Sequence, residues 1–77
     1  MKIDVNVAGV FTDLIKQSVV TISDVKSRND MLEYLNSHFP AVSKYKKITI
    51  INKRIVSSNV ALQDDDSVTI MPLYVGG

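Results

Sequence analysis

One segment of the chain has the pattern of an amphipathic helix, and strand-like segments surround it. Four apolar residues recur at spacings of three and four, namely Met31, Leu32, Leu35 and Phe39. Ser27, with Asp30 three residues later, resembles a capping box, and Pro40 cannot continue a helix. These signals predict one main helix over residues 28–38. Because such a helix must bury its apolar stripe, we expect it to cover one face of a sheet.

Five segments have strand patterns. Residues 2–8 alternate between apolar and polar side chains, which indicates a strand with one buried face. β-branched residues dominate 19–22 and 48–51. Asn52-Lys53 then predicts a two-residue hairpin turn into a short strand at 54–56, because Asn tolerates positive φ. A last strand is expected over 67–73, ending near Pro72, and a short helical or turn connection over 11–15.

The order strand, strand, helix, strand, strand, strand predicts an α+β fold. A chain of 77 residues is expected to form one domain, which we place at 1–73, followed by a C-terminal tail at 74–77. The predicted core contains the inward-facing apolar residues: Ile3, Val5, Val7, Val20, Ile22, Leu32, Leu35, Ile48 or its neighbours, Leu62, Val68 and Ile70.

Composition argues against several functional classes. Apolar residues make up 45% of the chain and the formal net charge is +1, so electrostatics give no case for a nucleic-acid partner. The chain has no cysteine, which excludes disulfides, thiolate nucleophiles and cysteine-based metal sites. We find no signal-peptide pattern and no apolar run long enough for a membrane span, so we expect a cytoplasmic protein. No catalytic motif is found, so we do not expect an enzyme acting alone, and we expect no bound cofactor or metal.

Three polar features favour structural interpretations. His38 lies in the last helical turn, where the helix dipole favours a cation. The acidic run 64–66 lacks the ligand spacing of an EF-hand loop and predicts a solvated turn. Five basic residues near the predicted hairpin either keep the surface soluble or meet an acidic partner surface: Lys44, Lys46, Lys47, Lys53 and Arg54.

The sequence ends in Gly76-Gly77. Two glycines add nothing to a core, but they form a thin arm that can enter an active site too narrow for any side chain. If a nucleotide monophosphate is attached to a terminal carboxylate, the resulting mixed anhydride can be attacked by a sulfur nucleophile to give a thiocarboxylate. Taken alone, the pair favours the simpler interpretation of a frayed chain end.

Four stretches of the chain resemble the MoaD/ThiS group of sulfur carriers, and its length and ending are most similar to the small subunit of molybdopterin synthase. Residues 1–7 resemble the first strand of that family, and 27–40 its capped helix ending in an aromatic-proline pair. Residues 50–56 resemble the central hairpin with its Asn turn. Residues 62–77 resemble the ending, in which an acidic turn leads to a strand, a proline and Gly-Gly.

This resemblance implies a ubiquitin-like β-grasp fold, with a mixed sheet of about five strands packed on one main helix. It implies that Gly77 is adenylated by an E1-like adenylyltransferase of MoeB/ThiF type, which uses ATP, and that Gly76 is its required neighbour. A sulfur donor enzyme would complete the thiocarboxylate, and a synthase partner of MoaE type or a thiazole synthase would consume it. Molybdopterin biosynthesis is the expected pathway. The alternatives are a thiazole sulfur carrier of ThiS type, a modifier that joins Gly77 to lysines, and an interaction domain with an idle tail.

Exposed apolar residues on the last strand either form a docking surface or are the ordinary exposed surface of a thin sheet, and the resemblance favours docking. If Val68 and Ile70 face the core, Met71 and Leu73 face outward, where Ile51 is expected to join them. In the resembled family this face meets the activating enzyme and the synthase, and we expect the strand to be exposed at an edge of the sheet. The full partner-binding set is Met71, Pro72, Leu73, Tyr74, Val75 and Ile51.

Overall fold

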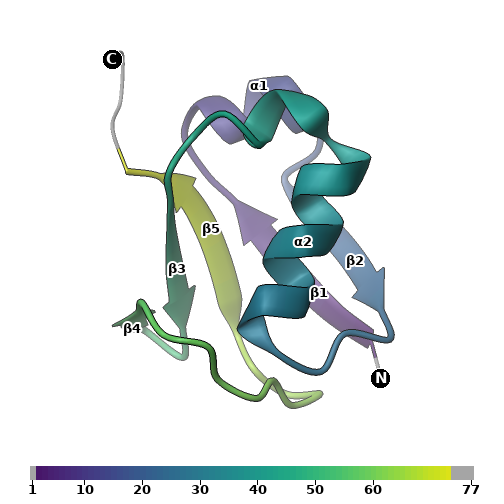
Figure 1. The fold of residues 1–77 in the computed structure, drawn as a ribbon, viewed down its shortest axis with the longest axis vertical. Coiled ribbons are helices and arrows are strands. Elements are labelled where there is room, and N and C mark those ends of the chain that lie inside the picture. Colours follow the sequence, from purple (N-terminus) through teal and green to yellow (C-terminus); the bar gives the residue numbers. More distant parts are fainter. Residues whose placement is uncertain (1, 74–77) are drawn as a thin grey trace.

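The computed structural model describes residues 2–73 and contains the predicted elements in the predicted order (Figure 1). The strands are β1 (Lys2–Val7), β2 (Val19–Ser23), β3 (Lys47–Ile51), β4 (Arg54–Val56) and β5 (Val68–Pro72). The helices are α1 (Val10–Ile15), α2 (Arg28–His38) and the 3-10 turn η1 (Pro40–Val42). The main helix has the predicted bounds, and α1 confirms the short helical connection.

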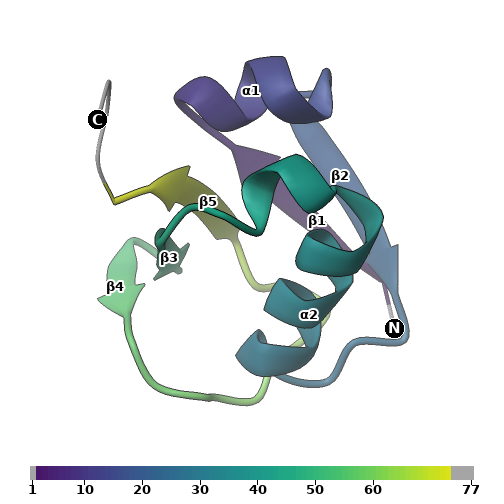
Figure 2. The ribbon, with the colours of Figure 1, turned by 45° about the horizontal axis from the view of Figure 1, so that its top comes forward.

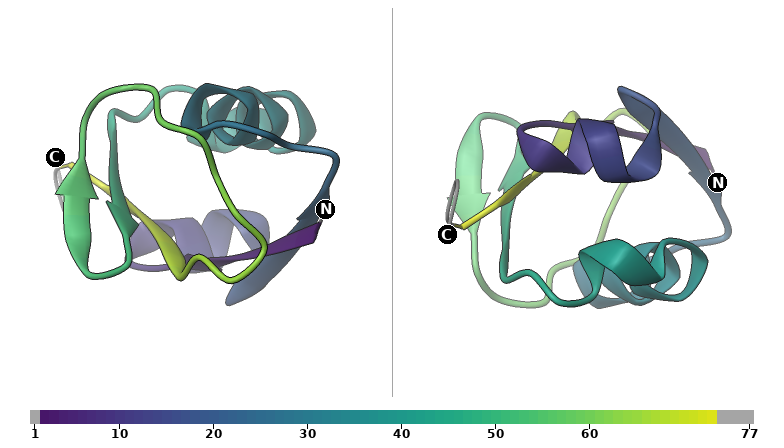
Figure 3. Two further views of the ribbon diagram at one scale, coloured as in Figure 1. Left: turned by 90° about the horizontal axis from the view of Figure 1, so that it is seen from below. Right: turned by 90° about the horizontal axis from the view of Figure 1, so that it is seen from above.

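The strands form one mixed five-stranded sheet in the order β2-β1-β5-β3-β4. β1 and β5 pair in parallel, and the other neighbours pair antiparallel. The left view of Figure 3 shows α2 on one side of the strands β1 and β5. This arrangement is a ubiquitin-like β-grasp fold, as the resemblance implied.

β5 is a central strand, so the prediction that it is exposed at an edge is wrong. It lies between β1 and β3, and the edge strands are β2 and β4 (Figure 2). The parallel pairing of β1 with β5 joins the two ends of the chain, and no local pattern in either segment indicates that contact.

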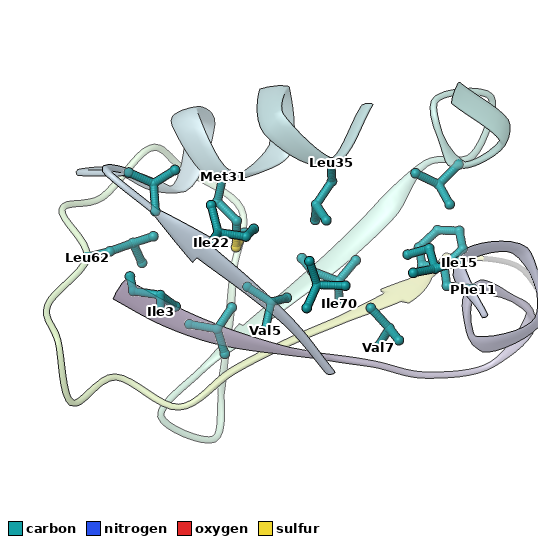
Figure 4. Close-up of a cluster of buried hydrophobic side chains, with 14 of the residues drawn as sticks. Ile3, Val5, Val7, Phe11, Ile15, Ile22, Met31, Leu35, Leu62 and Ile70 are labelled. Atoms are coloured by element: carbon teal, nitrogen blue, oxygen red, sulfur yellow. The ribbon is translucent and has the colours of Figure 1, made fainter. Parts of the chain in front are cut away.

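The core lies between α2 and the inner face of the sheet (Figure 4). Met31 and Leu35 are the buried residues of α2, whereas Leu32 is only partly buried. In β3 the inward-facing residues are Thr49 and Ile51, so Ile48 itself lies outside the core. The predicted core lacked six of the buried apolar residues: Phe11, Ile15, Val25, Met31, Val42 and Ile51.

Side-chain caps fix the start of α2. The Ser27 hydroxyl accepts a hydrogen bond from the Asp30 N–H at 3.2 Å, which confirms the predicted cap. The Asp30 carboxylate accepts from the N–H of Lys26, also at 3.2 Å, and not from the N–H of Ser27 as in a standard capping box. The first bond satisfies one of the N–H groups that an isolated helix end leaves unpaired, and the second fixes Lys26, the residue before the N-cap.

The β3–β4 hairpin turns at Asn52 and Lys53, whose φ angles are 51° and 69°. Positive φ at both residues is typical of a primed turn, and the two-residue turn predicted from the sequence is confirmed. The Asn52 side chain donates to Asp66 at 3.0 Å and accepts from the Ser67 N–H at 3.0 Å. These bonds tie the acidic turn 64–66 to the hairpin, so it has a structural role.

Candidate functional site: the exit of the C-terminal tail and the outer sheet face

The last described residue, Leu73, marks where the tail leaves the sheet. Its N–H donates to the carbonyl oxygen of Lys46 at 2.8 Å, which extends the β3–β5 pairing past Pro72. Four predicted site residues lie outside the described part of the chain: Tyr74, Val75, Gly76 and Gly77. The structure therefore describes the base of the predicted site and the surface around it.

Beside this exit, apolar side chains gather on the sheet face that α2 does not cover. Residues on β5 alternate, so Thr69 and Met71 face away from the buried Val68 and Ile70. Met71 pairs with Ile48, Thr69 pairs with Ile50, and Ile50 pairs with Ile55 on β4. Paired residues share a face, so these side chains are neighbours. We call the following set the outer patch: Ile48, Ile50, Ile55, Met71 and Leu73.

Ile55 and Leu73 are the most exposed members of the outer patch, at 74% and 44%. The neighbouring strands β1 and β2 present a mostly polar surface on the same face, with the exposed Val19 as an exception. There Thr21 donates to the Asp4 carboxylate at 2.7 Å, and Asn6 donates to the Val68 carbonyl oxygen at 3.3 Å. The apolar surface is thus concentrated on the half of the sheet from which the tail leaves.

Two members of the predicted partner-binding set are buried. Ile51 is only 8% exposed, because it pairs with Val68 and shares its inner face, so its expected outward position is wrong. Pro72 is also buried, and its ring lies against Gly9. Met71 is partly exposed and Leu73 exposed, as expected.

The sequence analysis missed Ile48, Ile50 and Ile55 as surface residues. A signal was available in the two-residue turn, which pairs the residues on either side of it, Ile51 with Arg54, and therefore Ile50 with Ile55. Once Ile51 is known to be buried, that register places Ile50 and Ile55 on the outer face of the sheet. Only the tertiary fold shows that Ile51 is buried.

The predicted basic patch separates into two groups. Lys44, Lys46 and Lys47 precede or begin β3 near the tail exit, whereas Lys53 and Arg54 lie at the other end of β3. The Lys47 ammonium donates to the Tyr45 carbonyl oxygen at 3.0 Å, and burial lowers the pKa of Lys47 below its usual value. Lys44 and Lys46 are exposed, so a cationic surface flanks the exit.

His38 has the structural role expected for it. Its Nδ1 lies 3.0 Å from the Tyr34 carbonyl oxygen, to which it donates because a carbonyl can only accept. The two rings stack with centroids 3.8 Å apart. Within residues 2–73 no group of acids and histidines is arranged to hold a metal ion, and no pocket indents the surface.

Comparison with known proteins fits this geometry. The model of the ThiS family matches residues 5–77, which includes the outer patch and the terminal glycines. The chain belongs to the ThiS family. This family and the related MoaD proteins are small ubiquitin-like carriers and modifiers that generally work with E1-like activating enzymes and synthase subunits. No curated protein matches the chain.

Three solved structures resemble the ThiS-family chain closely. A putative molybdopterin converting factor, subunit 1, from Pyrococcus furiosus is 19% identical with a TM-score of 0.80, over 94% of this chain and 97% of that one. The HVO 2177 protein of Haloferax volcanii is 21% identical with a TM-score of 0.79, over 100% and 87%. Small archaeal modifier protein 1 of Methanosarcina acetivorans is 18% identical with a TM-score of 0.80, over 99% and 96%. At these identities the matches establish a shared fold.

Among the described residues of this ThiS-family chain, no helix has both the length and the apolar character needed to span a bilayer.

Proposed function

We propose that this chain is a sulfur carrier whose Gly77 carboxylate is adenylated by an E1-like enzyme, converted to a thiocarboxylate and used as a sulfur donor in cofactor biosynthesis. The observation that carries the proposal is the ThiS-family match, because it extends through Gly76 and Gly77. The exposed outer patch beside the tail exit supports it, since a carrier needs a surface for its partners.

The chemistry divides one difficult substitution into two easier ones. A carboxylate oxygen of Gly77 attacks the α-phosphorus of ATP, and pyrophosphate leaves. A hydrosulfide or persulfide sulfur then attacks the carbonyl carbon of the mixed anhydride, and AMP leaves with the bonding electron pair. With a persulfide donor, reduction of the resulting acyl disulfide by a thiol releases the thiocarboxylate. In this proposal the chain binds no cofactor, and ATP is bound by the activating partner in the cytoplasm.

The length of the tail restricts where partners bind. Residues 74–77 can span at most about 14 Å when fully extended, at up to ~3.6 Å per residue. A partner that captures the Gly77 carboxylate must therefore contact the surface near Leu73. The outer patch is the apolar surface available there, and apolar side chains are what the centre of a protein interface buries.

Molybdopterin is the acceptor that we propose. The similarity to the molybdopterin converting factor subunit supports this choice, and the ThiS-family match keeps a thiazole carrier as the alternative. Incubating the thiocarboxylated chain with a synthase of MoaE type and a molybdopterin precursor, or with a thiazole synthase and its substrates, distinguishes the two. Sulfur transfer in only the second reaction would contradict the molybdopterin proposal.

A second candidate function is protein modification, favoured by the similarity to small archaeal modifier protein 1. In that case activated Gly77 forms an amide with a target lysine. Extracts of cells that express the chain would then contain a ladder of heavier conjugates that disappears when Gly76 and Gly77 are deleted. A carrier without modifier activity produces no such ladder.

The test of the carrier proposal uses two forms of the chain, the natural sequence and a form with one alanine added after Gly77. Each is incubated with a cognate activating enzyme, ATP and a sulfur donor, and its intact mass is measured. We expect the natural chain to gain the mass difference between sulfur and oxygen and the extended chain to stay unchanged. If the extended chain reacts equally well, the terminal glycine is not what the enzyme recognises.

A further inference from the structure

Gly9 and Pro72 are far apart in the sequence and touch at the base of the tail. Gly9 follows β1 with φ 63° and ψ −145°, a conformation that L side chains rarely adopt. A Cβ at this position would lie 3.2 Å from Pro72 Cδ and 3.4 Å from Pro72 Cγ. A side chain at Gly9 would therefore strain the backbone and push the buried proline ring away by a few tenths of an ångström.

Pro72 also ends the pairing of β5 with β1. The pairing runs to Val7 and Ile70, and the Ala8 N–H donates to the Ile70 carbonyl oxygen at 3.0 Å. The next bond of a parallel ladder would run from the N–H of residue 72 to the Ala8 carbonyl, and proline has no N–H. On this side of β5 the chain is thus released from β1, and the proline ring rests on Gly9 instead.

The opposite side of the strand end remains attached. Pro72 pairs with Lys47 on β3, and the Leu73 N–H donates to the Lys46 carbonyl oxygen at 2.8 Å. The end of β5 is therefore held on one side by a backbone hydrogen bond and on the other by a ring against a glycine. Two supports on opposite sides restrict both the position and the direction of the chain at Leu73.

We propose that Gly9 is a positioning residue for the carrier reaction, since its contact with Pro72 sets the direction of the chain at Leu73, from which the sequence continues to Gly77. This inference rests on the proposed function. A partner that has bound the outer patch then finds the end of β5 already held in one direction at Leu73. A strand end without this support must instead be oriented in every bound complex, at the entropic cost of fixing about one more residue.

This role predicts a separation of the kinetic parameters of the activating enzyme. Gly9→Ala leaves four of the five residues of the outer patch in place, namely Ile48, Ile50, Ile55 and Met71, so KM for the chain should stay within about twofold of the natural value. The kcat should fall by roughly 5- to 30-fold, the factor that corresponds to ordering about one residue. A purely structural role would lower the concentration of folded chain and so raise the apparent KM while leaving kcat unchanged.

The experiment measures ATP–pyrophosphate exchange by a cognate activating enzyme, with the complete chain as substrate. Two substitutions redirect the strand end: Gly9→Ala, and Pro72→Ala, which removes the ring and restores the N–H. Replacement of Gly9 by D-alanine in a synthetic chain is the matched control. D-residues favour positive φ, and their methyl group replaces the other of the two hydrogens on the glycine Cα. Val25→Ala is the stability control, since it opens a gap at a buried residue outside the strand end.

We expect kcat to fall for Gly9→Ala and Pro72→Ala and to stay near the natural value for D-alanine at position 9 and for Val25→Ala. An unchanged kcat in both Gly9→Ala and Pro72→Ala, or an equal loss in Val25→Ala, would overturn the inference. If the natural chain itself supports no exchange with any cognate activating enzyme, the proposed function fails, which is a different outcome.

Discussion

At the scale of single residues, Thr49 is the polar residue of the core. It is 1% exposed on the inner face of β3, and its Oγ1 has no hydrogen-bond partner. Its pairing partners on the neighbouring strands are Ile70 and Val56. A buried hydroxyl without a partner loses its hydrogen bonds to water and gains none in return.

Replacing Thr49 by valine, which has nearly the same shape, should therefore raise the free energy of unfolding by about 1 kcal/mol. Urea denaturation of the two proteins measures the difference. The control is the reverse change on the neighbouring strand β5, Val68→Thr. It should lower the free energy of unfolding, because Val68 is fully buried. A clear loss of stability in Thr49→Val would mean that the hydroxyl is satisfied in solution.

The position of Thr49 also shows what the sequence could not reveal. Residues 48–51 read Ile-Thr-Ile-Ile, a pattern that slightly favours Ile48 and Ile50 inward with Thr49 outward, whereas the structure has the other phase. The sequence predicted Ile48 or its neighbours for the core and Ile51 for the surface, whereas the structure buries Thr49 and Ile51 and leaves Ile48 partly exposed. Register with Val68 and Ile70 decides the phase, and those residues are distant in the chain.

At the scale of elements, the helix and the hairpin were predictable because their signals are local. Ser27, Asp30 and Pro40 mark the ends of α2, and the structure gives the predicted bounds. Asn52 marks the β3–β4 turn, which has the expected positive φ angles. The central place of β5 was not predictable, because it depends on parallel pairing with β1 through contacts such as Val5 with Val68.

Lys53 is the residue in the β3–β4 turn that fits its backbone least well. Its φ is 69°, a left-handed value that costs an L-residue with a Cβ roughly 1–2 kcal/mol and costs glycine nothing. Lys53→Gly should therefore raise the free energy of unfolding by about 0.5–1 kcal/mol, after glycine's own loss of chain entropy. Thermal unfolding measures this change.

Asn52→Ala in the same turn is the matched control and should have the opposite effect. It removes the side chain that bonds Asp66 and Ser67 and places a less tolerant residue at φ 51°. If Lys53→Gly destabilises the protein instead, the turn in solution differs from the one described above.

At the scale of the whole molecule, the outer patch and the tail exit lie together on one half of the sheet. The terminal glycines, Met71 and Leu73 could be assigned to this region from the sequence, because they follow one another along the chain. Gly9 and Lys46 could not, because only the completed sheet brings them next to the end of β5, and Ile55 could not, because it reaches this half of the sheet only through the pairing of β4 with β3 and of β3 with β5. The Gly-Gly motif thus predicted which end of the chain would react. The fold adds the outer patch beside that end and the contacts of Pro72 and Leu73 that hold the end of β5.

Ile55→Asp tests whether the outer patch binds the activating enzyme. Ile55 is 74% exposed, so the substitution should change the free energy of unfolding by no more than about 0.5 kcal/mol. If the patch is buried in the complex, KM for the chain should rise by about tenfold or more, which corresponds to a loss of ~1.4 kcal/mol of binding. Steady-state pyrophosphate exchange measures it.

Val19→Asp is the matched control for the outer patch. Val19 is also an exposed apolar residue, with 41% of its surface accessible, but it lies on the opposite edge strand β2. It should leave KM unchanged. An equal rise in KM for both variants would indicate general electrostatic repulsion by the added carboxylate, and no rise for Ile55→Asp would exclude this patch as the docking surface.

The most direct test of the central claim is to locate the transferred sulfur within the chain. The protein is treated with its activating enzyme, ATP and a sulfur donor, then cleaved, and the C-terminal fragment is sequenced by tandem mass spectrometry. We predict that the smallest C-terminal fragment ion, which contains only Gly77, already carries the mass difference between sulfur and oxygen. Sulfur found on any other residue, or a C-terminal fragment that stays unmodified while the enzyme is active, would contradict the account.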